Sequence, residues 1–313
     1  MTRRQWLKGT VLMGFSLALA QNRSERWVVI VSIDGGKPSA IRRLIAEGKL
    51  PNLKRLMDDG SYTLTAQTVI PSSTAPAHVS MLTGIDYPKR FPDDEDIVKK
   101  NEPFDERRHC PVSVVTVFEI AKQAGFRTAL FAGSGKRIKY AEKPSTLDVA
   151  EYLPSDDERL QRAIALLGDE RKRPHLLFLH LTETDHAGHK YGWGNDFLGI
   201  PPSPEYLQAL RNIDRRIGQL VVELKRQKLW AQTLLLITAD HGGIDKKHGG
   251  NSPDETTIPW IAAGGLARKS SELRLQRTIR IFDTAATALA ALGLPVPDDW
   301  DGKPIWQALR DGL

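Results

Sequence analysis

Side chains of metal-ligand type follow three apolar runs of the sequence. Asp34 comes directly after Val28–Ile33, and acidic and histidine-rich stretches follow Leu176–Leu181 and Leu234–Ala239. An isolated Asp after a strand is usually a helix or turn cap, and an isolated His is usually an ordinary polar residue. Three such strand ends in one chain offer carboxylates and imidazoles that suit two zinc-like ions: Asp34, Asp185, Asp240, His189, His241 and His248.

The cysteine content limits the metal chemistry that is open to the chain. Cys110 is the single cysteine among 313 residues, which excludes an internal disulfide framework and any multi-cysteine zinc or iron–sulfur site. A metal ion would therefore need histidine and carboxylate ligands. Glycines beside the candidate ligands, such as Gly35 and Gly242, allow the backbone to turn sharply and bring side chains from different strands together.

A nucleophile is the remaining requirement of a two-metal hydrolase, and Thr74 is the candidate. It lies in the segment Pro71–Gly84, which follows a strand-like run and is expected to open a short helix. A threonine hydroxyl is a poor nucleophile near neutral pH. Coordination to a metal ion lowers the pKa of such a hydroxyl, and a second ion can bind a phosphoryl oxygen or the leaving oxygen.

Five motifs occur in order along the chain between Asp34 and His248. They are Asp-Gly after the first strand, Thr-x-Pro-x-His at Thr74, an Asp-x-x-x-His pair from Asp185, Asp-His-Gly from Asp240 and a final histidine. In this order they resemble the motifs of the alkaline phosphatase superfamily, on its type I phosphodiesterase/nucleotide pyrophosphatase branch. Sulfatases of that superfamily need Cys or Ser followed by x-Pro-x-Arg, so the threonine and histidine found here argue against a sulfatase.

The resemblance implies a role for each ligand and a reaction. Two divalent ions, expected to be zinc, would be held by one set each: Asp34, Asp240, His241 and the Thr74 oxygen for the first, and Asp185, His189 and His248 for the second. The implied enzyme hydrolyses phosphodiester or pyrophosphate bonds of a small phosphorylated substrate through a phospho-threonine intermediate. A phosphomonoesterase with the same site is the alternative. A catalytically silent protein that uses bound metal for recognition is a third interpretation.

Two further residues are candidates for substrate binding. Lys136, after the strand-like run Thr128–Phe131, would bind phosphate oxygens through its charge, and a solvated loop lysine is the alternative. Asn101 would correspond to the phosphate-contacting asparagine of the family. The remaining histidines are expected to be structural or ordinary residues: His78, His109, His175, His180 and His186.

Such a site requires strands whose carboxyl ends meet at one edge of a sheet. From Arg26 onward, apolar runs alternate with amphipathic stretches, which is the pattern of a parallel sheet covered by helices on both faces. Strands are predicted over Trp27–Ile33, Thr128–Phe131, Leu176–Leu181, Leu234–Thr238 and Ile258–Ala263. Helices are predicted over Ser39–Glu47, Asn52–Asp58, Val114–Ala124, Asp157–Leu167, Glu205–Lys228 and Asp283–Leu292.

The predicted organisation is one α/β metal-dependent phosphohydrolase domain over residues 26–313, with a largely parallel central sheet. No shift in composition marks a second domain. Tyr87–Pro111, rich in Pro and charged residues, and Lys190–Pro204, rich in Gly and Pro, are predicted to be loops over an edge of the sheet. Neither a phosphate-binding loop of the NTPase type nor a dinucleotide-binding glycine motif is present.

Residues 1–20 have the features of an export signal. Arg3 and Arg4 precede the apolar run Gly9–Ala20, which is shorter than the about 20 residues of a membrane span and ends in a small-x-small cleavage pattern. The adjacent arginines resemble a twin-arginine signal. An ordinary secretory signal and an uncleaved anchor are the alternatives. We expect an exported enzyme, periplasmic or extracellular, without a membrane span after processing.

The basic excess belongs in part to this leader. Removing the leader's three basic residues lowers the formal net charge from +6 to +3. Along the predicted helices basic residues alternate with acidic ones, which is typical of a solvated face and not of a nucleic-acid-binding surface. No nucleic acid is expected as a specific partner, and the sequence does not indicate an oligomeric state.

Overall fold

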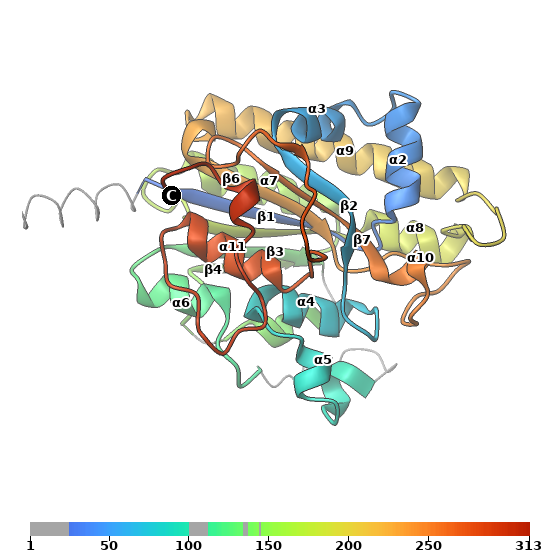
Figure 1. Cartoon of the computed structure of the whole chain (residues 1–313). Coiled ribbons are helices and arrows are strands. Elements are labelled where there is room, and N and C mark those ends of the chain that lie inside the picture. The colour runs from blue at the N-terminus through green and yellow to red at the C-terminus, as the bar shows by residue number, and fades with distance from the viewer. Residues whose placement is uncertain (1–24, 100–111, 134–136, 144) are drawn as a thin grey trace, which may run out of the picture.

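An eight-stranded sheet runs through the centre of the molecule (Figure 1). The computed structural model describes residues 25–99, 112–133, 137–143 and 145–313. Its strands lie in the order β4-β3-β5-β1-β6-β7-β2-β8, with the bounds β1 (Trp27–Ile33), β2 (Ser61–Gln67), β3 (Thr128–Gly133), β4 (Val149–Leu153), β5 (Leu176–Leu181), β6 (Thr233–Ala239), β7 (Thr257–Ala263) and β8 (Ser271–Glu272). Neighbours from β4 to β6 are parallel, whereas β7 is antiparallel to β6 and β2. The predicted largely parallel α/β sheet is confirmed.

Helices cover both faces of this sheet (Figure 1). One face carries α2 (Pro38–Ala46), α3 (Pro51–Asp59), α7 (Asp156–Gly168) and α9 (Pro204–Arg226), with α8 (Glu183–Tyr191) packed against α9. The other face carries α4 (Thr74–Thr83), α6 (Val117–Gln123) and α11 (Asp283–Ala291). Shorter helices include α5 (Tyr87–Arg90), α10 (Pro253–Thr256), a π-helix (Glu95–Lys99) and 3₁₀ turns at Arg137–Ala141, Trp230–Gln232 and Trp306–Ala308. No helix among the described residues has both the length and the apolar character to cross a membrane.

Hydroxyl side chains determine where three of these helices begin. Thr116, Ser155 and Ser203 each accept a hydrogen bond from the backbone N–H three residues further on, at 3.1–3.2 Å. Such a cap stabilises a helix by about 1 kcal/mol. Because Thr116 is a cap, the helix predicted over Val114–Ala124 begins only at Val117.

The candidate ligands lie in the segments that follow three adjacent strands, β5, β1 and β6. Every residue of β5 and β6 is buried, which explains their nearly continuous apolar sequences. Ile33, the last residue of β1, pairs with Leu181 on one side and with Ala239 on the other. The residues that follow these three strands therefore emerge side by side at one edge of the sheet.

The structure differs from the sequence prediction at the margins of the sheet. Strands β2, β4 and β8 were not predicted. Ser61–Gln67 is rich in hydroxyl residues, Val149–Leu153 is a half-buried edge strand with mixed polarity, and β8 has only two residues. The predicted loop Tyr87–Pro111 is wrong over residues 87–90 and 95–99, which form α5 and the π-helix, and its residues 100–111 lie outside the described residues. The segment predicted as the loop Lys190–Pro204 is a connection between helices, apart from its ends in α8 and α9.

Candidate active site

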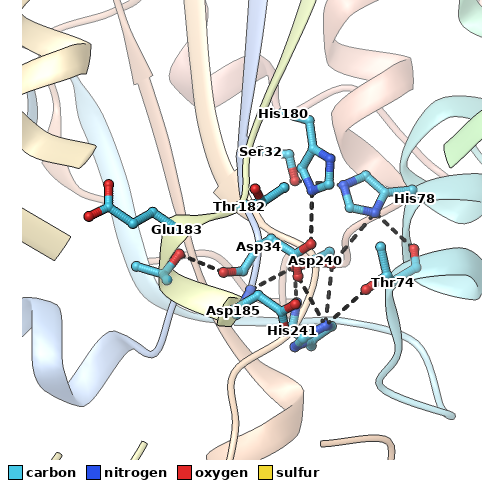
Figure 2. Close-up of polar contacts among 12 residues, drawn as sticks. Ser32, Asp34, Thr74, His78, His180, Thr182, Glu183, Asp185, Asp240 and His241 are labelled. Atoms are coloured by element: carbon cyan, nitrogen blue, oxygen red, sulfur yellow. Dashed lines mark hydrogen bonds and ion pairs between the residues drawn. The ribbon is translucent and has the colours of Figure 1, made fainter. Parts of the chain in front are cut away.

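Three ligand-type side chains converge where β1 and β6 end (Figure 2), and we call them the buried cluster. Asp34, Asp240 and His241 are fully buried. His241 Nε2 lies 3.4 Å from Asp34 Oδ1 and 3.4 Å from Asp240 Oδ2. The backbone N–H groups of Gly35 and His241 donate to Asp240 Oδ1 at 3.0 and 2.9 Å. These two hydrogen bonds fix the carboxylate with its other oxygen toward the imidazole.

Asp185, His189 and His248 form a second group, which we call the open cluster. Asp185 and His189 lie one turn apart on α8, so they project from the same face of the helix, and His248 lies in the loop after β6. Asp185 Oδ1 is 3.3 Å from His189 Nε2 and 3.6 Å from His248 Nε2. Side-chain exposure is 3% at Asp185, 13% at His248 and 47% at His189. The His248 ring stacks on that of His241 with centroids 3.7 Å apart, so the two clusters adjoin.

Backbone carbonyls fix the tautomer of three histidines in these clusters. The Nδ1 atoms of His189, His241 and His248 lie 3.1, 2.8 and 3.0 Å from the carbonyl oxygens of Lys246, Gly242 and Ser72, respectively. A carbonyl oxygen can only accept a hydrogen bond, so each Nδ1 carries the proton and donates it. In the neutral form of each ring, Nε2 then presents a lone pair to the site, which is the state in which imidazole binds a metal ion.

The donor atoms fit two divalent ions. Ligand atoms of Asp34, Asp240 and His241 lie within 4.8 Å of one another, and so do those of Asp185, His241 and His248. The Nε2 atoms of His189 and His248 are 3.1 Å apart, close to the about 3.3 Å expected for two imidazoles on one tetrahedral zinc ion. Two lone pairs at that distance repel each other, and buried carboxylates cost free energy, unless cations compensate both. The arrangement therefore suits metal binding.

Thr74 is the first residue of α4, and its hydroxyl points toward the buried cluster (Figure 2). Thr74 Oγ1 lies 3.5 Å from His241 Nε2. Ser73 precedes the helix in an extended conformation. The residue before it, Ser72, is the one whose carbonyl accepts the hydrogen bond of His248, so the start of α4 is joined to the open cluster. The first backbone N–H groups of a helix have no intrahelical acceptor and favour anions. A phosphoryl group at the cluster would meet both the hydroxyl and this helix end.

His180 and His78 support the buried cluster from the sheet and from α4. His180 Nε2 lies 3.0 Å from Asp34 Oδ2. His78 donates through Nδ1 to the Thr74 carbonyl at 2.8 Å and accepts at Nε2 from the Ser32 hydroxyl at 2.8 Å. His78, which was expected to be structural, also lies with Nδ1 3.5 Å from Asp240 Oδ2, and ligand atoms of His78, His180 and Asp240 lie within 4.8 Å of one another. His180, expected to be ordinary, instead contacts a candidate ligand, and the available signal was its place as the single polar residue of the buried strand β5.

Burial keeps two of these imidazoles neutral. Loss of solvation holds the pKa of His78 well below its usual value, and the neighbouring His180 lowers it further. Burial, followed by the proximity of His241, lowers the pKa of His248 to about 3. Both side chains are therefore uncharged at neutral pH, which agrees with a lone pair on His248 Nε2.

Trp193 packs among the segments that carry the ligands. Its indole Nε1 donates to the Gly35 carbonyl at 2.9 Å, and its ring lies 5.0 Å from that of His189. A Cβ atom at Gly188 or Gly243 would lie 2.1 or 2.3 Å from the indole, so only glycine allows this approach. Close packing around one rigid ring thus fixes α8 relative to the loop after β6.

The two candidate substrate-binding residues lie outside the described residues. Lys136 follows the end of β3, and Asn101 lies in the stretch 100–111. Their proposed contacts with phosphate stay predictions. The six candidate metal ligands and Thr74, in contrast, all lie at one edge of the sheet.

Comparison with known proteins agrees with this arrangement. The family model described as type I phosphodiesterase / nucleotide pyrophosphatase matches residues 28–255. The chain belongs to this family. The matched region contains every residue of the buried and open clusters and Thr74.

Relatives of known name are similar over different shares of the chain. Human ectonucleotide pyrophosphatase/phosphodiesterase family member 1 is 26% identical over 210 residues, which are 62% of this chain and 21% of that protein. The catalytic subunit of human GPI ethanolamine phosphate transferase 2 is 26% identical over 305 residues, 90% of this chain and 29% of its own. Venom phosphodiesterase 2 of Crotalus adamanteus is 23% identical over 253 residues, 76% and 29% of the two chains. The chain thus spans less than a third of the length of these relatives.

Solved structures share the fold. Murine ectonucleotide pyrophosphatase/phosphodiesterase 5 in complex with AMP superimposes with a TM-score of 0.68 at 16% identity, over 88% of this chain and 97% of that chain. A 2-O GAG sulfatase superimposes with a TM-score of 0.69 at 15% identity, over 91% and 74%. At these identities the likeness establishes the alkaline-phosphatase-like fold alone.

Proposed function

We propose that the protein is a two-metal hydrolase of phosphodiester or pyrophosphate bonds that acts through a phospho-threonine at Thr74. The observation that carries this proposal is the position of the Thr74 hydroxyl, at the start of α4 and 3.5 Å from His241 Nε2. Membership in the family, whose members similar to this chain include phosphodiesterases, supports the class of bond. The small phosphorylated substrate is proposed on the same grounds, since one solved relative is in complex with AMP.

The two clusters define which residues would hold each ion. We assign one ion to Asp34, Asp240, His241 and the Thr74 oxygen, and the other to Asp185, His189 and His248. Imidazole and carboxylate ligands of this number favour zinc. Bound there, the ions would lower the pKa of the Thr74 hydroxyl and compensate the charge of the phosphoryl group.

In the first step, the Thr74 hydroxyl gives up its proton to solvent and Oγ1 attacks the phosphorus atom. The Oγ1–P bond forms, the bond from phosphorus to the leaving oxygen breaks, and the leaving group takes up a proton from solvent. The N–H groups of Thr74 and Ala75 would donate to the non-bridging oxygens, since Pro76 has no N–H and the Ala77 N–H donates to the Ser73 carbonyl. His78 holds the Thr74 carbonyl, so it keeps the nucleophile at the helix end.

In the second step, water attacks the phospho-threonine. A bond forms between the water oxygen and phosphorus, and the water gives up a proton. The bond between phosphorus and Thr74 Oγ1 breaks, the phosphorylated product departs and the threonine hydroxyl regains a proton. The 47% exposure of the His189 side chain supports access of water from the side of the open cluster. His180 holds Asp34 in the same orientation through both steps.

Replacement of the nucleophile tests the proposal. We expect Thr74→Ala to lower kcat for bis-p-nitrophenyl phosphate by at least ~10⁴-fold, because loss of a nucleophile removes the covalent route. Thr74→Ser, the matched control, keeps a hydroxyl and should retain measurable turnover. Zinc content by mass spectrometry verifies that Thr74→Ala still binds metal, and wild type acid-quenched during turnover of this diester should gain the mass of one p-nitrophenyl phosphoryl group. Wild-type turnover in Thr74→Ala would refute the role of this residue.

Substrate comparison tests the class of bond. Turnover of p-nitrophenyl phosphate, its bis-ester and a thymidine 5′-monophosphate aryl ester is measured on the zinc-loaded protein. We expect both diesters to be preferred. A monoester preference above ~100-fold, about 2.7 kcal/mol of transition-state discrimination, would assign a phosphomonoesterase instead. If none of the three substrates is turned over by protein that has been stripped with a chelator and then reloaded with zinc, the protein is a silent binding protein.

We also propose an export route and a domain organisation. Residues 1–20 would form a twin-arginine export signal, and residues 26–313 a single metal-dependent phosphohydrolase domain that acts in the periplasm or outside the cell. The support is the Arg3-Arg4 pair before a short apolar run and the single sheet that the described residues form. Export should stop in Arg3→Lys/Arg4→Lys if the twin-arginine route is used, whereas an ordinary secretory signal would tolerate this change.

A further inference from the structure

The connection between α8 and α9 presents large apolar side chains to solvent. Phe197 is 91% exposed, Leu198 62% and Ile200 47%, and we call these three residues the apolar tip. The connection projects at the right of Figure 1, beyond the ends of α8 and α9. Single exposed apolar residues are common, but three within four positions of one projecting loop form a patch of the kind that marks an interaction site.

Hydrogen bonds hold this loop in shape, so the exposure is built into the backbone. Asn195 and Ile200 exchange two backbone hydrogen bonds at 2.8 and 2.9 Å, and the Leu198 N–H donates to Asn195 Oδ1 at 3.1 Å. The carboxylate of Asp196, next to the tip, pairs with the buried ammonium of Lys37 at 3.1 Å. The apolar tip therefore stands out from an anchored base and does not fold back onto the core.

Exposed lysines lie on the segments next to the base of the tip. Lys190 lies at the end of α8, and Lys246 and Lys247 lie in the neighbouring turn, all three with exposed side chains. This turn is joined to the base of the loop, since Trp193 donates through its backbone N–H to the Asp245 carbonyl at 2.7 Å. Two exposed acids also lie here, Asp245 in the turn and Asp196 beside the tip, but Asp196 is paired with Lys37, so the three lysines outnumber the acid that remains.

We propose that the apolar tip inserts into the interface of a lipid bilayer that carries anionic lipids. An apolar projection next to lysines matches a bilayer surface, because the side chains enter the acyl boundary while the ammonium groups stay at the headgroups. Anionic lipids attract each such lysine within about a Debye length, which is about 8 Å at physiological ionic strength. A small apolar ligand would not account for the neighbouring charges.

Docking in this way would hold the open cluster toward the membrane. The turn that carries Lys246 also accepts the hydrogen bond of His189, and Trp193 at the base of the loop lies with its ring 5.9 Å from that of His248. The inference rests on the loop and its charges, so it does not depend on the proposed hydrolytic reaction.

A fluorescent label at the tip tests insertion directly. In the full chain with Cys110→Ser, Phe197→Cys provides one site for an environment-sensitive label, and Val222→Cys on α9, where Val222 is 66% exposed, provides the matched control. With vesicles of phosphatidylcholine and phosphatidylglycerol, we expect a blue shift of the label at position 197 and none at 222. Residues 1–20 are common to both variants, so they do not affect the comparison. Equal responses at the two positions would overturn the proposal.

Substitution at the tip gives a second, independent measurement. We expect Phe197→Ser/Leu198→Ser to lower the vesicle partition coefficient about tenfold relative to Val222→Ser. Lys246→Gln/Lys247→Gln should weaken binding to anionic vesicles and leave binding to pure phosphatidylcholine unchanged. A blue shift at position 197 that appears without vesicles as protein concentration rises would assign the tip to a contact between copies. A higher KM for a soluble diester with unchanged partition would assign it to substrate. Either result would overturn the proposal.

Discussion

The buried and open clusters contain the same kinds of side chain in different surroundings. Asp34, Asp240 and His241 are fully buried and follow neighbouring strands of one sheet, whereas His189 on α8 is 47% exposed and His248 lies in a loop. Ligands at paired strand ends cannot separate without disrupting the sheet, while a helix and a loop can move relative to each other. We infer that the buried cluster sets the position of the nucleophile and that the open cluster exchanges with solvent.

The largest effect is expected in the buried cluster. Asp240→Asn keeps the size of the side chain but removes its charge, and we expect kcat/KM for a diester to fall by about 10³-fold, because metal-ion stabilisation contributes several kcal/mol. Excess zinc should not restore activity, since the buried site cannot adapt. Asp245→Asn, in an exposed turn nearby, is the control. Recovery of Asp240→Asn at high zinc would contradict the distinction between the clusters.

A smaller and reversible effect is expected in the open cluster. His189→Asn should weaken binding of one zinc ion by about 100-fold, and added zinc should restore much of the lost turnover, because the site is accessible. His186→Asn, an exposed histidine of the same helix, should behave as wild type. Zinc titration of the apoprotein followed by activity measures both variants. A loss that zinc cannot reverse would show that the open cluster is as rigid as the buried one.

The support beneath the buried cluster should have a weaker effect still. His180→Leu removes the hydrogen bond to Asp34 Oδ2, and we expect the zinc affinity of the buried cluster to fall about tenfold. His180→Gln can still donate and should recover part of this affinity. Competition with a chelator measures the affinity apart from activity. Equal affinities for the two variants would assign His180 to packing alone.

A separate effect concerns the pH dependence of stability in the metal-free protein. The pKa of His248 is lowered to about 3 by burial, whereas an unfolded histidine has a pKa of about 6.5, so the unfolded chain binds a proton first as the pH falls. Between pH 6.5 and 3, His248 therefore lowers the free energy of unfolding by about 1.4 kcal/mol for each unit by which the pH falls. Urea unfolding at pH 7.5, 6 and 5 should therefore show a shallower dependence for His248→Asn than for wild type. Parallel curves would contradict the burial argument.

Residues next to strand ends could be located from the sequence with accuracy. Asp34, Asp240 and His241 directly follow long apolar runs, and the order of parallel strands brings such positions to one edge. Thr74 was placed by its motif, and the structure puts it at the start of a helix as expected. Local adjacency is sufficient here because the backbone itself determines where these side chains lie.

Features that depend on tertiary packing could not be predicted in the same way. An apolar run has no direction, so the reversal of β7 is invisible in Thr257–Ala263. The contact between His180 and Asp34 depends on strands that are far apart in the chain. Phe197 is apolar, so burial would be expected, but its side chain is exposed. The backbone hydrogen bonds of its loop hold it in this position, and the sequence does not reveal them.

The indole of Trp193 acts as a spacer that fixes the distance between the two clusters. It reaches the turn after Asp34 through Gly35, touches α8 at Gly188 and touches the loop after β6 at Gly243. Folding around this ring brings the ligands together before any ion arrives, so the loss of conformational freedom accompanies folding and not metal uptake. A change of ring size at this one position would therefore alter the separation of the buried and open clusters.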